Sequence, residues 1–316
     1  MRRALIIAAC LLLGSSSARA GVWQRATNVE HAKNATTSSQ AEALIEKAHA
    51  AAKMGRTAER LLILREARAL LDKAGAATSS NVETRRQLAG VYYGLHQLQG
   101  DVADLRRAAD LLTWVGQRKL PKLIRVEVMA DLALCHARLG QHAKEVAAYD
   151  DAIAHAGPPE QLAILLANQA EGYMALGKLR DAISGYRESL RVVPMIGMAK
   201  LGVTTHWGLA VALDRSGDLR SAMIQIRDAR VYDPHDLRIN GDDWIYVPAH
   251  DEHWYRALGN WQHARVATDD RTRIARYQQA IAEYARYIDR APEGDRWISL
   301  AEHRYRQCER EMRQQR

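Results

Sequence analysis

The sequence predicts an all-α protein built from repeated helix pairs, and three features of the chain carry this prediction. Its 316 residues are 47% hydrophobic and 26% charged, as in ordinary globular proteins. It contains no Phe, 12 Tyr and 7 Trp, so its core has to consist mainly of Ala and Leu. These residues favour helices, whereas strands favour β-branched and aromatic side chains. The third feature is a pattern of Ala, Gly and Pro that returns along the chain, and together the three exclude a β-sandwich or a β-barrel.

A basic pair, an apolar run and a stretch of small residues open the chain in that order. Arg2 and Arg3 precede the apolar residues 4–13, and small residues follow up to Ala20. This order is typical of a secretory signal peptide and predicts cleavage after Ala20. The apolar run is about half the length of a membrane-spanning helix, and no later segment approaches that length. We therefore expect an exported protein that is not an integral membrane protein.

Two other forms of export fit parts of the same segment. Ile7, Ala8, Ala9 and Cys10 resemble a lipoprotein cleavage box, which would place a lipid on Cys10. The basic pair fits twin-arginine export, but the rest of that motif is missing. Each alternative takes the protein out of the cytosol. After the signal peptide of residues 1–20, residues 21–38 are rich in Asn, Thr and Ser towards their end, which predicts a flexible segment.

The repeated pattern is clearest in the middle of the chain, where small residues, a central Gly and a closing Pro or Gly recur in order. One copy carries Ala170, Tyr173, Gly177, Ala182, Tyr186, Leu190 and Pro194. The next carries Ala210, Leu213, Gly217, Ala222, Ile226, Ala229 and Pro234. An upstream copy carries Ala133, His136, Gly140, Tyr149, Ala152 and Gly157. Each copy predicts a helix, a turn at Gly and a second helix.

Each position in the pattern has a physical reason. Small residues such as Ala170 and Ala182 let the two helices of a pair approach closely. Larger residues such as Tyr186 fill the space between neighbouring pairs. Pro194 and Pro234 are expected to stop the second helix, since Pro cannot continue it.

This arrangement resembles the tetratricopeptide repeat family, whose repeats are helix pairs of about 34 residues with the same order of small, aromatic, Gly and Pro positions. Weaker copies cover residues 39–75, 82–120 and 254–292, although Glu145 and the polar run 268–272 depart from the pattern. The resemblance implies an α-solenoid of about six repeats over residues 39–292. Residues 293–316 are expected to form a capping helix with a polar outer face that includes Arg304.

The resemblance also implies a groove lined by the first helix of each repeat, which would bind a protein or peptide. The positions that match this groove combine aromatic, basic and acidic side chains, a mixture common in binding hot spots. They are Arg86, Tyr93, Arg138, Glu171, Met174, Trp207, Asp214 and Arg215. The Lys and Asn pairs with which some members bind a terminal carboxylate are missing at the matching positions.

The segment between Pro234 and Trp254 is a second candidate site, because a loop longer than about 12 residues in a compact array is often functional. Trp244 and Tyr246 are expected to fold it over the edge of the solenoid and to contact a partner. An alternative is a metal or ligand site within residues 240–253. There His250 and His253, one helix turn apart, would supply nitrogen ligands, and Asp242 and Asp243 would supply oxygen. Asp251 and Glu252 also suit a charged helix N-terminus.

No phosphate-binding Gly-rich loop, Gly-x-Ser-x-Gly elbow or His-Glu-x-x-His motif occurs in the sequence. The formal net charge is only +8, and the basic C-terminus is interrupted by Glu309 and Glu311, which argues against nucleic acid. Cys135 and Cys308 fall on apolar helix faces and are expected to pack there. We therefore predict an exported protein-interaction scaffold, periplasmic or attached to the cell envelope, with no cofactor and no catalysis.

Overall fold

The structure is a computed structural model that describes residues 29–196, 199–240 and 248–315. The predicted signal peptide, with Cys10, lies outside the described residues. All regular structure in the described part of the chain is helical, which confirms the predicted fold class. None of the described helices is long and apolar enough to cross a membrane. The chain divides into two compact units, and the boundary falls between Ala156 and Gly157.

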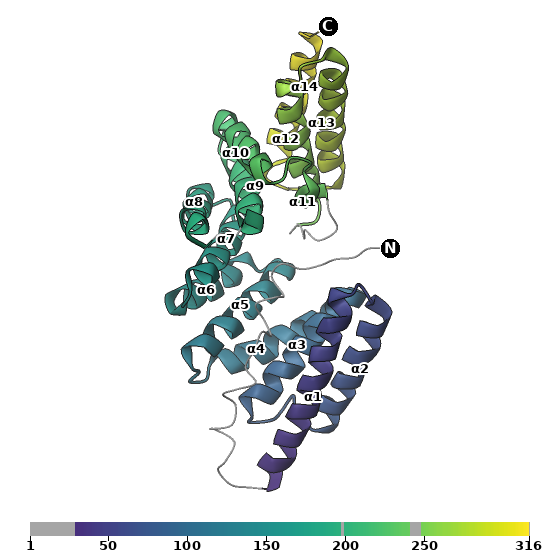
Figure 1. The fold of residues 1–316 in the computed structure, drawn as a ribbon, viewed down its shortest axis with the longest axis vertical. Helices are drawn as coiled ribbons and strands as arrows, with labels where there is room; N and C mark the ends of the chain where they lie inside the picture. The colour runs from purple at the N-terminus through teal and green to yellow at the C-terminus, as the bar shows by residue number, and fades with distance from the viewer. Residues whose placement is uncertain (1–28, 197–198, 241–247, 316) are drawn as a thin grey trace. The chain divides into compact units, whose positions relative to one another are not determined.

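The first unit consists of three helix pairs, coloured purple to teal in Figure 1. The two helices of each pair pack against one another, and α2 and α4 also pack against the first helix of the next pair. This succession of helix pairs was predicted from the sequence. The helices are α1 (Val29–Lys53), α2 (Thr57–Lys73), α3 (Val82–Gln99), α4 (Val102–Gly116), α5 (Lys122–Arg138) and α6 (His142–His155).

The second unit consists of three further pairs and a last helix that packs against α13 (Figure 1). The pairs are α7 with α8, α9 with α10, and α12 with α13, while the short α11 packs on α12. The predicted capping helix is therefore present as α14. The bounds are α7 (Pro159–Ala175), α8 (Leu179–Ile196), α9 (Ala199–Arg215), α10 (Leu219–Tyr232), α11 (Leu237–Asn240), α12 (Asp251–Val266), α13 (Asp270–Arg290) and α14 (Ile298–Arg313).

Five of the helix pairs reverse direction at a Gly with a positive φ angle, as the repeated Gly predicted. At Gly140 φ is 68°, a left-handed conformation that residues with a Cβ atom adopt only at a cost. The N–H of Gly140 donates to the carbonyl of Ala137 (3.0 Å), and that of Gln141 donates to His136 (2.8 Å). These bonds satisfy carbonyls that the end of α5 leaves free, as in a Schellman motif. The five turn residues are Gly55, Gly100, Gly140, Gly177 and Gly217.

Two helix boundaries differ from the sequence prediction. α1 begins at Val29, so residues 29–38 of the predicted flexible segment are helical. This stretch contains no Gly or Pro that would stop a helix. α8 continues to Ile196 and so includes Pro194, which was expected to end it. A proline this close to a helix C-terminus removes only one donor, and the helix ends two residues later.

Small residues and tyrosines fill the core as the repeat pattern predicted. Ala170 of α7 and Ala182 of α8 are fully buried, and so is Tyr186. A Cβ atom on Gly208 of α9 would lie 2.6 Å from the Tyr186 ring. Tyr186 therefore fills the space between α8 and the next pair and depends on a glycine there.

The hydroxyl groups of two buried tyrosines on α13 differ in their surroundings. The Tyr287 hydroxyl donates to Oδ1 of Asp295 at 3.1 Å. The Tyr284 hydroxyl is buried and has no hydrogen-bond partner among the described residues. Burial raises the pKa of Tyr284 well above its usual range, so the hydroxyl stays neutral. The two residues lie one helix turn apart and form a matched pair.

We expect Tyr284→Phe to raise the free energy of unfolding by about 1 kcal/mol, because it removes a buried hydroxyl without a partner. Tyr287→Phe is the control and should lower the free energy of unfolding by about 1 kcal/mol, because Asp295 loses a donor. Urea denaturation followed by far-ultraviolet circular dichroism measures both. A loss of stability in Tyr284→Phe equal to that in Tyr287→Phe would contradict the assignment.

Candidate partner-binding surface

The three groove residues predicted in the first unit come from the first helices of neighbouring pairs. Tyr93 lies on α3 and Arg138 on α5, and Nε of Arg138 donates to the Tyr93 hydroxyl at 3.0 Å. The Arg138 guanidinium carbon also lies 5.5 Å from the centre of the Tyr93 ring, within the range of a cation–π contact. The structure therefore brings together two residues that are 45 positions apart in the sequence.

Arg86, the third of these residues, is held by acidic side chains instead of being free at the surface. Its guanidinium contacts Glu83 on the same helix at 3.0 Å and Glu127 on α5 at 3.0 Å. Only 8% of the Arg86 side chain is exposed. Burial raises the pKa of Glu127, and the Arg86 charge opposes that rise. Arg86 thus links α3 to α5 and has little area left for a partner.

Asp131 adds a second acidic group on α5 to this cluster. The residue is partly exposed, but its Oδ1 atom is buried and has no hydrogen-bond partner in the described structure. Burial raises the pKa of Asp131 well above its usual range, against the attraction of Arg86. Sequence reasoning missed this residue, because nothing in the repeat pattern distinguishes it from a solvated acid.

In the second unit most of the predicted groove residues are packed inside. Trp207 and Asp214 of α9 are fully buried, and Met174 of α7 is 4% exposed. Glu171 of α7 is the exposed member of the set. The sequence expectation of a surface position is therefore wrong for Trp207, Asp214, Arg215 and Met174. Their binding role stays a prediction, and in this structure these side chains contribute to packing.

Helices α12 and α14 bury the end of α9 through two charged residues that are adjacent in the sequence. Asp214 accepts hydrogen bonds from the Trp254 indole at 3.0 Å and from Nε of Arg304 at 2.8 Å. Arg215 makes a two-pronged ion pair with Asp251, at 3.1 and 2.6 Å. Asp214 thus holds both α12 and α14, and Arg215 holds α12.

Arg215 also lies over two indole rings. Its guanidinium carbon is 4.8 Å from the centre of the Trp254 ring and 5.1 Å from that of Trp297. A guanidinium over aromatic faces gains cation–π energy while its N–H groups bind a carboxylate. The ion pair and both ring contacts hold the Arg215 side chain between α9 and α12.

Two sequence interpretations change as a result. Arg304 was expected on the polar outer face of the last helix, but it is 6% exposed and faces Asp214. Asp251 begins α12 as expected of a charged helix N-terminus, and it is also the buried partner of Arg215. Only a search for opposite charges in different repeats could have predicted these two buried partners. The spacing of residues within one repeat carries no such information.

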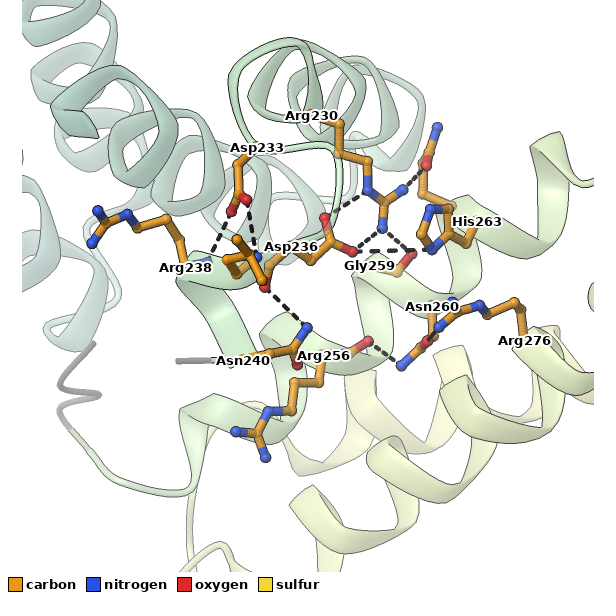
Figure 2. Close-up of polar contacts among 12 residues, drawn as sticks. Arg230, Asp233, Asp236, Arg238, Asn240, Arg256, Gly259, Asn260, His263 and Arg276 are labelled. Carbon is orange, nitrogen blue, oxygen red and sulfur yellow. Dashed lines mark hydrogen bonds and ion pairs between the residues drawn. The ribbon is translucent and has the colours of Figure 1, made fainter. Parts of the chain in front are cut away.

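The predicted loop after Pro234 begins with an ordered helical turn, α11, that the sequence did not predict. Figure 2 shows Arg230 of α10 reaching Asp236 through two contacts, at 2.8 and 2.7 Å. Asp233 accepts hydrogen bonds from the backbone N–H groups of Leu237 and Arg238, at 3.0 and 2.9 Å. Asp236 has a φ of 54°, a conformation rare outside glycine. These bonds stabilise the tight corner between α10 and α11.

The same arginine attaches this corner to α12. Arg230 also donates to the carbonyl of Gly259 at 2.9 Å and to the side chain of Gln262 (Figure 2). Trp244 and Tyr246, predicted to contact a partner, lie outside the described residues. Their position relative to this corner stays a prediction.

The two histidines of the alternative metal site, His250 and His253, form hydrogen bonds with side chains of other residues in the structure. Nε2 of His250 lies 3.3 Å from Asp295, and Nδ1 of His253 lies 2.6 Å from Glu283. Nη1 of Arg290 lies 2.8 Å from the other nitrogen of His253. The described residues contain no group of three or more His, Cys, Asp or Glu that could hold a metal ion. Asp242 and Asp243 lie outside them.

No protein family model and no curated protein matches this sequence. Solved structures do match the arrangement of helix pairs. One is a signal-transduction ATPase with numerous domains and a tetratricopeptide repeat sensor, from Pyrococcus horikoshii. The TM-score is 0.56 and the sequence identity is 14%. The match covers 86% of this chain and 42% of the other chain. This chain has a tetratricopeptide-like fold. The apo form of RapI is also similar, with a TM-score of 0.52 and 12% identity over 87% of this chain and 98% of its own. At these identities the likeness is one of fold.

The raised pKa of Asp131 predicts how the stability depends on pH. Its folded pKa lies above its unfolded value, so the ionised carboxylate destabilises the folded state at neutral pH. This cost disappears as the pH falls through the folded pKa towards the ordinary value of about 3.9. We expect Asp131→Asn to raise the free energy of unfolding at pH 7 and to lose this advantage near pH 4.

Asp151→Asn is the matched control for this prediction, since a hydrogen bond from Arg125 lowers the pKa of Asp151. We expect that variant to be less stable than the parent at pH 7, with the difference shrinking in acid. Urea titrations at a series of pH values measure both. A neutral or destabilising effect of Asp131→Asn at pH 7 would contradict the role assigned to burial.

Proposed function

We propose that this chain is an exported scaffold that binds a protein partner through side chains displayed by its stacked helix pairs. The observation that carries the proposal is the tetratricopeptide-like fold, in which neighbouring helix pairs within each unit pack against one another. In the similar protein from Pyrococcus horikoshii such repeats form a sensor. We propose a recognition role of the same kind for this chain.

Glu171 and Arg138 are the contact positions with the clearest support. Glu171 is exposed on α7, and Arg138 is partly exposed on α5, where Tyr93 orients its guanidinium. Buried members of the predicted groove, such as Trp207 and Arg215, would act by holding the helices in place. Trp244 and Tyr246 remain predicted contacts at the edge of the second unit.

The N-terminal segment supports the proposal of export. A basic pair, a short apolar run and small residues up to Ala20 are the features on which signal peptidase depends. We propose that the protein acts in a bacterial periplasm or at the cell envelope, as a protein cleaved after Ala20. Attachment through a lipid on Cys10 is the alternative form of the same proposal.

A photo-crosslinking amino acid at Glu171 tests the binding surface. We expect it to capture a discrete partner in intact cells, because Glu171 projects from the first helix of its pair. The matched control carries the same amino acid at Arg187, an exposed position on the second helix α8, and should not capture that partner. Identical products from both positions, or none from either, would contradict the proposed surface.

Mass spectrometry of the protein purified from its native host tests export. We expect a mature chain that begins at Gly21 and is recovered in the envelope or periplasmic fraction. An Ala20→Leu variant, which blocks cleavage, should retain the N-terminal segment. A mature protein with an intact Met1 would contradict export by this signal, and a lipid-bearing Cys10 at the N-terminus would select the lipoprotein alternative.

A further inference from the structure

A cluster of uncompensated positive charge lies where the start of α3 meets the end of α4 in the first unit. The guanidinium carbon of Arg85, in the first turns of α3, lies 3.6 Å from the centre of the Trp114 ring near the end of α4. That of Arg118, just beyond α4, lies 4.0 Å from the centre of the same ring. Two arginines thus share one indole, each at the distance of a close cation–π contact.

Neither of these two arginines has an acidic partner among the described residues. Arg85 is held by a hydrogen bond from its Nε to the carbonyl of Ser79 at 2.5 Å, which leaves its other N–H groups available. The nearby acid Glu83 is engaged by Arg86. Partial burial and the charge of Arg118 both lower the pKa of Arg85, as expected when like charges lie close together.

The sequence around this corner strengthens the positive field. Residues 111–126 contain no Asp or Glu, while Arg118 and Lys119 are exposed between α4 and α5 and Lys122 is exposed at the start of α5. The fourth base of this stretch, Arg125, is compensated by Asp151. Leu123 is 59% exposed beside these charges, so the corner also offers an apolar contact.

We propose that this basic corner, made of Arg85, Trp114, Arg118, Lys119 and Lys122, binds an acidic peptide segment of the partner. The inference rests on the proposed function and names the chemistry of its ligand. Guanidinium groups held over an aromatic ring keep their N–H edges for carboxylates, which they bind in a two-pronged geometry. Carboxylate side chains of an extended peptide would relieve the repulsion between the two arginines, and an apolar neighbour would cover Leu123.

Isothermal titration calorimetry with a capped oligo-glutamate peptide tests the proposal on the mature chain. We expect binding that weakens with added salt, and no binding of the matched oligo-glutamine peptide. Arg85→Gln and Arg118→Gln should each weaken binding about tenfold, as loss of a charge-assisted hydrogen bond does. Arg118 is exposed outside the helices, so its replacement leaves the fold intact even if Arg85→Gln does not.

Arg106→Gln is the control, since it removes an equal charge from an exposed position earlier on α4. It should leave peptide affinity unchanged within about twofold, because a distant exposed charge is screened. Equal affinity of all variants for the peptide would overturn the proposal. Arginine-dependent binding to equimolar phosphatidylglycerol–phosphatidylcholine vesicles without peptide binding would also overturn it, in favour of a membrane surface. Inorganic phosphate competing as well as the peptide would reduce the corner to a general anion site and overturn the peptide assignment.

The partner captured through Glu171 separates this inference from the proposed function. If the Arg118→Gln variant still captures the partner at Glu171 and binds the peptide as tightly as the parent, the scaffold function is supported and the basic corner has no part in it. Loss of peptide binding in the arginine variants without any partner captured at Glu171 supports the corner and contradicts the groove.

Discussion

Five of the six described helix pairs depend on a short left-handed turn that joins their two helices. Because the chain reverses within a few residues at Gly140 or Gly177, the two helices must lie antiparallel and in contact. Ala on the buried sides then allows the helix backbones to approach closely, and within each unit the next pair adds its first helix to the same core. In two turns, an Asp directly after the Gly caps the second helix, as Asp218 does by accepting from the N–H of Ser221 at 3.0 Å. Turn, cap and helix contact are thus encoded within a few consecutive residues.

This local encoding explains which parts of the structure could be predicted from the sequence. The Gly turns, the buried Ala positions and the burial of Tyr186 follow from spacing within one repeat, and all three are confirmed. Tyr93 and Arg138 were both named as groove positions, but only the structure shows that they touch. Helix ends were less predictable. Pro194 did not end α8, and the Ser- and Thr-rich segment did not delay the start of α1, because the residues around them favour a helix.

The burial of charged residues could not be predicted in this way. Arg304 and Asp214 are 90 positions apart, and no periodicity links them. From sequence alone, a charged residue is expected at the surface, because burial of an ion without a partner costs several kcal/mol. Only the folded chain shows that Arg304 meets Asp214 and that Asp251 meets Arg215, so that each burial is compensated. Such pairs add little net stability over apolar residues, but each requires its own partner, and this requirement fixes where α12 and α14 attach to α9.

The missing Phe connects packing with the candidate surface. A chain that uses Tyr in place of Phe gains a hydroxyl at every such core position, and each hydroxyl needs a partner or costs stability. Tyr287 and Tyr93 meet this need with Asp295 and Arg138, whereas the hydroxyls of Tyr186 and Tyr284 have no partner among the described residues. The use of Tyr in place of Phe therefore costs stability at Tyr186 and Tyr284 and orients a side chain at Tyr93. At Tyr93 the ring packs in the core while its hydroxyl holds Arg138, so a core residue sets the direction of a charge that is proposed to meet the partner.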